Sequence, residues 1–378
     1  MSARARVVLI GATGVFGRHL AGHLARMGGI DLVGTSRSFD KAAALKVCTP
    51  YALDHRAGFS AALAALEPWL VIDASGPFQS AGHDVPRAAL EAGAHVIDIA
   101  DARGYLLGYG AALDALARAK GLVALAGASS TPALSSAAAI ALTEGWSRID
   151  SIDIAIAPGG RSEVGRAVIE AILSYAGRPV PEWRDGRLQA ATGWGAMRRL
   201  AMPGLGVRKV SPVETVDAEL LPGILGVRDR VTFSAGLESQ IEQASLVALA
   251  YLRRRNLLGD ARPAIPALLA LRRVTSLPMS DRGGMLVEAR GLDGSGRAVA
   301  AQWSLLAEKG DGPHVPVLPA LAAVRALLAG ALAPGARVCA GDLPLAAIER
   351  EMQPLAISTR RSLEQMPALR PARHVLLK

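Results

Sequence analysis

The sequence predicts an α/β protein: a Rossmann-type, doubly wound parallel sheet followed by an α+β domain with a mixed or antiparallel sheet. The first part is predicted by a glycine-rich turn, residues 11–17, that connects a short apolar segment to an amphipathic helical pattern. Strand-like and helix-like segments then alternate through about the first 130 residues. The second part is predicted by a change to alternating polar and apolar residues beyond Pro132, which is typical of a sheet with one covered face.

The strand, glycine turn and helix at the start are those of a dinucleotide-binding βαβ unit. In this motif the first glycine allows a tight turn, the second lets the backbone approach a pyrophosphate, and the third lets helix pack on strand. The free N–H groups at the start of the helix face the phosphates. The residues that we expect to bind the cofactor here are Gly11, Thr13, Gly14, Val15, Phe16 and Gly17.

Six strands and five helices are predicted in the first part. The strands are Val7–Ile10, Asp31–Thr35, Leu45–Cys48, Leu70–Asp73, His95–Ile99 and Leu122–Leu125. The helices begin at Gly14, Ala57, His83 or Asp84, and Gly108, and after Pro132. This amounts to one complete Rossmann domain, which we place at residues 1–130.

The second part is expected to form a separate α+β domain over residues 131–335. Its predicted strands are Ser151–Ala157, Val207–Val216, Arg230–Phe233, and a hairpin of Met285–Leu292 with Ala298–Leu305. Its predicted helices are Gln240–Arg255 and Pro316–Leu332. The segment 336–378 contains a helical stretch that could return to the first domain.

Composition and charge exclude several classes of protein. The net charge is +9, but its arginines are scattered and only 4% of residues are aromatic, which argues against nucleic-acid binding. Arginine suits anionic small molecules, although a solvated basic surface explains it equally well. The apolar stretch Leu318–Leu332 is interrupted by Arg325 and is shorter than a bilayer span, so we expect no membrane insertion.

The first residues of the chain and its cysteines predict a cytoplasmic protein. Residues 1–6 are basic and precede an apolar run, but the glycine turn takes the place of a signal peptide's cleavage site. Cys48 and Cys339 are the only cysteines, and they offer neither metal-ligand spacing nor a disulfide framework. We therefore expect a reducing compartment and no metal site. A homodimer is kept as one alternative for the oligomeric state.

The end of the second predicted strand indicates NADP as the cofactor, with NAD as the alternative. An NAD enzyme usually has an acidic residue there to hold the ribose 2′-hydroxyl. This chain instead has Ser36, Arg37 and Ser38, a cation between hydroxyls, which suits a 2′-phosphate. An ordinary surface arginine is the alternative interpretation.

Two further loops follow predicted strands at the edge where a nicotinamide would lie. Ser75, Gly76 and Pro77 come after the fourth strand and are expected to face the cofactor. Asp98 and Asp101 come after the fifth and are candidates for catalysis, with helix capping as the alternative.

The loop after the sixth strand carries three hydroxyls, Ser129, Ser130 and Thr131. Ser129 and Ser130 are candidates for substrate binding, and helix capping before Pro132 is compatible with that role. Arg161 and Arg166 are candidates to hold a substrate carboxylate, with plain surface charge as the alternative.

Three histidines are considered for chemistry. His314 follows a flexible turn and could supply a proton during hydride transfer, although a solvent-exposed histidine is the competing interpretation. His19 and His23 have the spacing of metal ligands on one helix face, but we interpret them as a surface pair.

Taken together, these motifs resemble the saccharopine dehydrogenase-like (saccharopine reductase-type) oxidoreductases. The resemblance depends on residues 11–17, 75–78, 92–98 and 127–132, and more weakly on 310–313 and 319–320. It implies a Rossmann domain, a second α+β domain, and pyridine-nucleotide oxidoreduction at a carbon–nitrogen bond. Ala133 follows Pro132 where the family commonly has glycine, and no lysine is placed as an obvious proton carrier.

The resulting expectation is an NADP-dependent oxidoreductase that acts on a small-molecule imine, amine or carbonyl compound. A short-chain dehydrogenase is disfavoured because no tyrosine precedes a lysine by four residues. The alternative from another class is a nucleotide-binding scaffold or redox sensor without catalysis.

Overall fold

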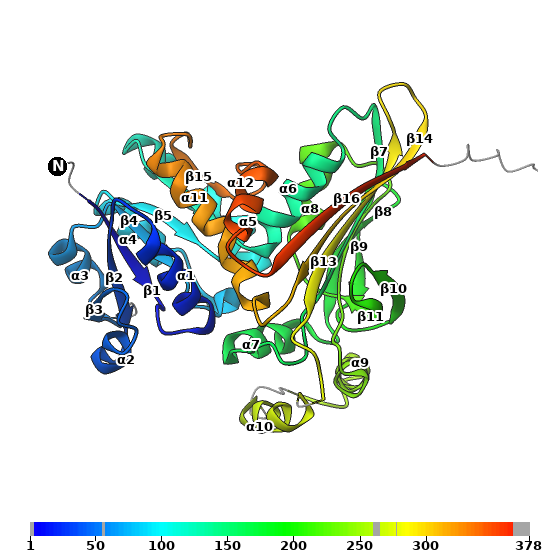
Figure 1. Cartoon of the computed structure of the whole chain (residues 1–378), viewed down its shortest axis with the longest axis horizontal. Coiled ribbons are helices and arrows are strands. Elements are labelled where there is room, and N and C mark those ends of the chain that lie inside the picture. The colour runs from blue at the N-terminus through cyan, green and yellow to red at the C-terminus, as the bar shows by residue number, and fades with distance from the viewer. Residues whose placement is uncertain (1–3, 55–56, 260–264, 277, 366–378) are drawn as a thin grey trace, which may run out of the picture.

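The computed structural model describes residues 4–54, 57–259, 265–276 and 278–365. In these ranges the chain builds two large sheets, seen on the left and right of Figure 1, with helices between them. The predicted fold class is confirmed: the first sheet is parallel and the second is mixed.

The first sheet has seven parallel strands in the order β15-β6-β5-β4-β1-β2-β3. The strands are β1 (Ala5–Ile10), β2 (Ile30–Ser36), β3 (Thr49–Ala52), β4 (Leu70–Asp73), β5 (His95–Asp98), β6 (Val123–Ala126) and β15 (Gly335–Val338). The order reverses beside β1, so the crevice at the carboxyl ends of β1 and β4 is where an open parallel sheet binds its ligand. β4 is buried along its whole length, and its first three residues are apolar, because helices cover both faces of the sheet.

The helices of the first part pack on both faces of this sheet. They are α1 (Val15–Arg26), α2 (Phe39–Ala43), α3 (Phe59–Leu66), α4 (Asp84–Glu91) and α5 (Arg103–Ala119), with a short 3₁₀ turn η1 (Phe78–Ser80). α3, α4 and α5 bury one apolar cluster, whereas α1 belongs to the larger core on the opposite face.

The second sheet has nine strands, and its main path runs β10-β11-β12-β7-β13-β14-β16. The strands are β7 (Arg148–Ala157), β8 (Pro179–Arg184), β9 (Arg187–Thr192), β10 (Arg198–Met202), β11 (Gly206–Pro212), β12 (Arg230–Ala235), β13 (Gly283–Leu292), β14 (Ala298–Ala307) and β16 (Ile357–Gln365). β7 and β12 are parallel, β13 pairs antiparallel with both β7 and β14, and the hairpin of β8 and β9 attaches to β12.

One continuous core joins the two sheets. It includes apolar side chains of α1 and of the helices between the sheets, and it ends on the inner face of β7, β13 and β14. The remaining helical elements are η2 (Ser130–Leu134), α6 (Ser135–Leu142), α7 (Arg166–Tyr175), α8 (Asp217–Leu225), α9 (Gln240–Arg254), α10 (Ile265–Thr275), η4 (Gly312–Val317), α11 (Leu318–Leu328) and α12 (Leu345–Met352). Figure 1 shows α6, α11 and α12 between the sheets and α9 and α10 below the second sheet.

Several predicted elements were wrong or incomplete. Residues 45–48 are not a strand, because α2 ends just before them and Lys46 turns the chain at a φ of +57°; the strand, β3, follows. The helix predicted from Gly108 begins five residues earlier, at Arg103. The segment 336–378 contributes to both sheets. β15, which begins one residue before this segment, is the seventh strand of the first sheet, and β16 pairs with β14 in the second sheet.

Candidate functional site

A cavity of about 730 Å³ lies at the carboxyl ends of β1, β2 and β4. We call it the nucleotide cavity. It is lined by Ile10, Gly11, Thr13, Thr35, Ser36, Arg37, Ser38, Lys41, Leu53, Asp54, Ser75, Gly76, Pro77, Arg166, Ala167 and Glu170. Eight of these residues are among the twelve that the sequence predicted for the cofactor, although their loops are separated by dozens of residues in the chain.

The glycine turn has the geometry that the sequence motif requires. Gly11 has a φ of +74°, and a Cβ there would lie 2.7 Å from the Cα of Ser75. A Cβ on Gly17 would lie 2.0 Å from the carbonyl oxygen of Gly11, so only glycine lets α1 pack this closely on the turn. At Gly14 the nearest neighbour of such a Cβ would be the same oxygen at 3.2 Å.

The start of α1 is open toward a ligand. Gly14 is the N-cap residue of this helix and supplies no side-chain cap for the first turn. The first backbone N–H groups of a helix need partners, and an anionic phosphate is a suitable one.

The loop after β2 presents hydroxyls and cations to the same cavity. The Thr13 hydroxyl donates to Ser36 Oγ at 3.3 Å, and Ser36 Oγ also accepts from the backbone N–H of Ser38. Arg37 and Lys41 are exposed at the cavity, and the structure records no ion pair for either with a described residue. Asp31 is engaged elsewhere, since it accepts from Arg6 at 2.9 Å.

A second, smaller cavity of about 230 Å³ lies between the start of α1, the loop after β6 and the second sheet. We call it the apolar cavity. It is lined by Phe16, Ser130, Ile156, Pro158, Ser162, Glu163, Val164, Val168, Gly283, Gly284, Met285, Leu305, Ala307, Gly312, Pro313, Val315 and Pro316. Phe16, predicted for the cofactor, therefore faces this cavity together with Ser130, predicted for the substrate.

Helix α7 of the second part separates the two cavities. Its Val168 lines the apolar cavity, whereas Arg166 lines the nucleotide cavity. A Cβ on Gly165, which precedes α7, would lie 3.2 Å from a methyl group of Val15. α7 thus begins against the glycine turn. The side chain of Val15, which was predicted to bind the cofactor, lies against Gly165 and does not line the nucleotide cavity.

Arg166 was predicted to bind substrate, but its position is at the nucleotide cavity. It is paired with Glu170 at 2.6 Å on the same helix. Beside α7, Arg18 of α1 forms an ion pair with Glu163 of the second part. The Arg18–Glu163 ion pair connects α1 to the segment just before α7.

Asp98 lines neither cavity. It is 1% exposed and accepts hydrogen bonds from the hydroxyl of Tyr105 and the backbone N–H groups of Ala100 and Gly127. Burial raises the pKa of this carboxyl to about 7. The carboxyl connects the ends of β5 and β6 to α5, so we assign it no part in the reaction. Asp101 also lines neither cavity and accepts from Gln79 at 3.2 Å.

His314 lies in η4 against helix α1, with its neighbours Pro313 and Val315 in the apolar cavity. Its Nδ1 is 2.8 Å from Nε2 of His23, and its ring centre is 4.1 Å from that of His19. His19 and His23 are therefore not a solvent-facing pair, and His23 is buried. Among the described residues, no group of three or more His, Cys, Asp and Glu is placed to bind a metal ion.

The hydroxyl loop after β6 is held by the second part of the chain. The hydroxyls of Thr131 and Ser135 donate to Asp217, a fully buried residue at the start of α8. Ser129 is buried and lines neither cavity, so Ser130 alone of the predicted serines faces one.

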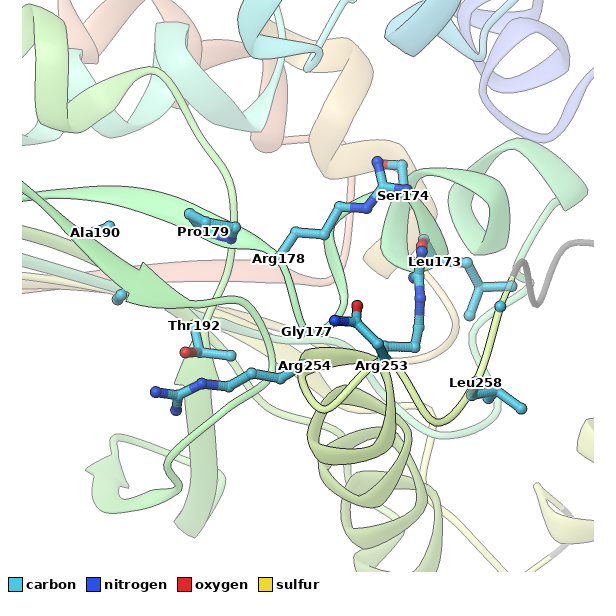
Figure 2. Close-up of a pocket in the computed structure, with 13 residues that line it drawn as sticks. Leu173, Ser174, Gly177, Arg178, Pro179, Ala190, Thr192, Arg253, Arg254 and Leu258 are labelled. Atoms are coloured by element: carbon cyan, nitrogen blue, oxygen red, sulfur yellow. The ribbon is translucent and has the colours of Figure 1, made fainter.

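A third cavity, of about 750 Å³, lies at the other end of α7 and is lined by Arg178, Arg253 and Arg254. Figure 2 shows Arg253 and Arg254 leaving the end of α9 in different directions. Arg253 donates to the carbonyl of Leu173 in the last turn of α7, a favourable place for a cation. Arg161, the other predicted substrate residue, is exposed and lines none of the three cavities.

Comparison with solved structures relates this arrangement to known dehydrogenases. Apo saccharopine dehydrogenase (L-Glu forming) from Saccharomyces cerevisiae matches with a TM-score of 0.68 over 95% of this chain and 100% of the yeast chain, at 13% identity. This chain has the fold of saccharopine dehydrogenase. The resemblance predicted from the sequence motifs is confirmed at the level of the fold.

A more distant match has the same outline. A meso-DAPDH mutant with DAP from Clostridium tetani E88 matches with a TM-score of 0.50 over 93% of this chain and 99% of that chain, also at 13% identity. No family model matches the sequence, and no curated protein matches it. No helix in the described ranges is both long and apolar enough to cross a bilayer.

Sequence reasoning missed several residues of the two cavities. Lys41 and Asp54 line the nucleotide cavity from α2 and from the residues after β3. Val168 and Met285 line the apolar cavity from the second part. Lys41 lies in the first turn of α2, directly after the loop that carries Arg37, and this closeness in the chain could have found it.

Proposed function

We propose that this protein is a pyridine-nucleotide oxidoreductase that prefers NADP and acts on a small imine, amine or carbonyl compound. The observation that carries the proposal is the nucleotide cavity. Its wall combines the glycine turn, the hydroxyl- and cation-bearing loop after β2, and the loop after β4. The saccharopine dehydrogenase fold supports the same activity class.

The residues present fit such a cofactor. The uncapped first turn of α1 provides backbone donors for a pyrophosphate, while the N–H of Gly14 itself donates to the carbonyl of Gly11 at 2.9 Å. Arg37, with Ser36 and Ser38 beside it, would hold a 2′-phosphate, and Lys41 adds a second positive charge. When bound, the nucleotide would supply or accept a hydride at its nicotinamide ring.

The chain's own residues would then bind and orient the substrate in the apolar cavity. The nicotinamide half of a nucleotide bound to this type of sheet extends past the helix start toward the switch-point crevice. Phe16 and Ser130 mark that side of the cavity, and Ser130 and Ser162 carry hydroxyls that can donate to the oxygen or nitrogen of a substrate. The surrounding apolar side chains would exclude water from the reaction.

Two measurements on the purified protein test this proposal. Titration with NADPH and NADH, followed by nucleotide fluorescence, should show binding of both with a lower Kd for NADPH. Absorbance at the reduced nicotinamide band should then fall when small aldehydes or ketones are added, with or without ammonia or methylamine. Absence of nucleotide binding would overturn the proposal, and tight binding without turnover of any compound would favour a scaffold or sensor.

A further inference from the structure

The composition of the apolar cavity restricts what can react there. Among its described lining residues only three have polar side chains, namely Ser130, Ser162 and Glu163. No arginine, lysine or histidine side chain is among them. A cavity of about 230 Å³ is also below the roughly 300–1,000 Å³ of pockets for drug-sized ligands, so it suits the reacting end of a molecule.

The floor of this cavity belongs to the rigid second sheet. Ile156 of β7, Met285 of β13 and Leu305 of β14 are direct neighbours in register across three strands. Residues in register on adjacent strands point to the same face, so the three side chains form one continuous apolar surface. A strand-based wall of this kind holds its shape better than a loop does.

The charges near the cavity do not favour an anion. Glu163 is the one charged side chain in its lining, and it is already paired with Arg18. Other cations near the cavity are not in its lining and have partners of their own. Arg272 donates to the backbone carbonyls of Gly160 and Ser162 and is paired with Glu242 at 2.8 Å. Arg166 faces the nucleotide cavity with its partner Glu170, and Arg282, next to Gly283 in the chain, is paired with Glu308 at 2.9 Å.

The arginine-lined cavity does not supply the missing charge. Its residues Leu173 and Ser174 are in the last turn of α7, whereas Val168 of the apolar cavity is in the first turn, about 7.5 Å away along the helix axis. None of its arginines lines the apolar cavity, and Arg253 donates to the carbonyl of Leu173. A carboxylate at the reacting end of a substrate would therefore enter an apolar space without a cation, which is strongly unfavourable.

We propose that the substrate has no carboxylate next to its reacting carbon, and that this carbon belongs to an apolar aldehyde, ketone or imine. The inference rests on the proposed function, and it separates this chain from enzymes that reduce the keto or imino carbon of an amino-acid backbone. The residues that set the specificity are Met285, Leu305 and Val168, which provide apolar contact where an arginine would hold a carboxylate.

Matched pairs of compounds test the inference. Methyl pyruvate and pyruvate differ only in whether the carboxyl is esterified, and kcat/KM for each is measured with NADPH, with and without methylamine. We expect the ester to be preferred by at least roughly a hundredfold, since an unpaired buried carboxylate is disfavoured by several kilocalories per mole. In parallel, the unreactive pair isobutyramide and isobutyrate is titrated by NMR into the NADP-saturated protein, where only the amide should bind.

A designed charge provides a second test. Val168→Arg places a cation in the cavity and should move the ester-to-acid preference, and the amide-to-acid binding ratio, at least tenfold toward the acid. Val168→Met is the uncharged comparison of similar length and should show no shift toward the acid, because it adds bulk without a cation. Equal or better use of the acids by the parent protein would overturn the inference, as would failure of both unreactive ligands to bind. Nucleotide binding is measured separately, so loss of the proposed function is told apart from failure of this inference.

Discussion

At the scale of single residues, the three glycines of the turn differ in what a side chain would do. A methyl group on Gly17 would lie 2.0 Å from the carbonyl oxygen of Gly11, whereas on Gly14 it would lie 3.2 Å from that oxygen. Gly17 is therefore needed for packing, and we expect Gly14 to leave room for a pyrophosphate. The two roles can be separated experimentally.

We predict that Gly14→Ala folds normally but binds NADPH at least tenfold more weakly, because its Cβ occupies space near the phosphates. Gly17→Ala should lower the free energy of unfolding by about 1–3 kcal/mol or more, because the backbone of α1 must move away from the turn. Urea unfolding and nucleotide titration of both variants check this. Normal NADPH affinity in a folded Gly14→Ala protein would contradict the assigned role.

We also predict that the choice of cofactor depends on Arg37. Arg37→Asp should weaken NADPH binding roughly ten- to a hundredfold, since a charge-assisted contact is lost and a carboxylate repels the 2′-phosphate. NADH binding should be unchanged or improved. Arg360→Asp, on exposed β16, is the matched control for a change in net charge. If the ratio of the Kd for NADPH to the Kd for NADH is the same in Arg37→Asp as in the parent, Arg37 is an ordinary surface residue.

At the scale of elements, α1 and η4 are joined by a histidine cluster. Arg26 donates to Nδ1 of His23 at 3.1 Å, and a guanidinium can only donate, so Nε2 of a neutral His23 donates to Nδ1 of His314. Burial first, and then the neighbouring His314, lowers the pKa of His19 and of His23 to about 4. Protonation of His23 would place a hydrogen on Nδ1, so that this N–H and the guanidinium N–H of Arg26 would be two donors facing each other.

This cluster predicts a pH dependence of stability. The folded pKa of about 4 lies below the ordinary 6.5, so between these values the unfolded chain binds more protons. Stability should therefore fall as the pH drops from about 6.5 to 4, by about 1–2 kcal/mol for half-buried rings. His23→Gln keeps a donor to His314 without a titrating ring, and the fall in its midpoint for thermal unfolding should be smaller than in the parent.

Asp98 acts in the opposite direction and must be separated from the cluster. Its pKa is raised to about 7, so its folded form keeps a proton that the unfolded chain loses above about pH 4, and stability falls as the pH rises toward 7. This contribution is the same in the parent and in His23→Gln. The difference between the two proteins at each pH therefore reports the histidines, and parallel curves would contradict the prediction.

At the scale of the whole molecule, the last part of the chain completes both sheets. β15 pairs with β6 at the edge of the parallel sheet, and β16 pairs with β14 at the edge of the second sheet. Between them α12 packs on α11 and contributes to the core that joins the sheets. The domain boundaries at residues 130 and 335 remain a prediction. The pairings of β15 with β6 and of β16 with β14 connect the last segment to each of the two preceding parts.

We predict that a chain shortened to residues 1–334 is insoluble or unfolds at much lower temperature, because it loses an edge strand from each sheet and exposes the core beneath α12. A chain of residues 1–365 keeps β15 and β16 and should match the full-length protein in circular dichroism and in its unfolding midpoint. Nucleotide binding by a folded 1–334 protein at the full-length affinity would show that the final strands are dispensable.

The sequence alone determined the fold class and half of the residues that line the nucleotide cavity. The glycine turn is a local device, since its spacing specifies the strand, the turn and the start of α1 within a few residues. Parallel strands carry their functional loops to one edge, so Arg37 and Ser75 could be assigned to one cavity from their positions after predicted strands. These signals need no knowledge of distant contacts.

Only the tertiary structure decided how the second part meets the first. Strand pairing is non-local, so the sequence pattern could not place β15 beside β6, or Ile156 and Leu305 on either side of Met285. The same reason explains why Arg166 was expected at the substrate and instead lies at the nucleotide cavity. Periodicity shows which face of an element is apolar, but which surface covers that face depends on packing between residues far apart in the chain.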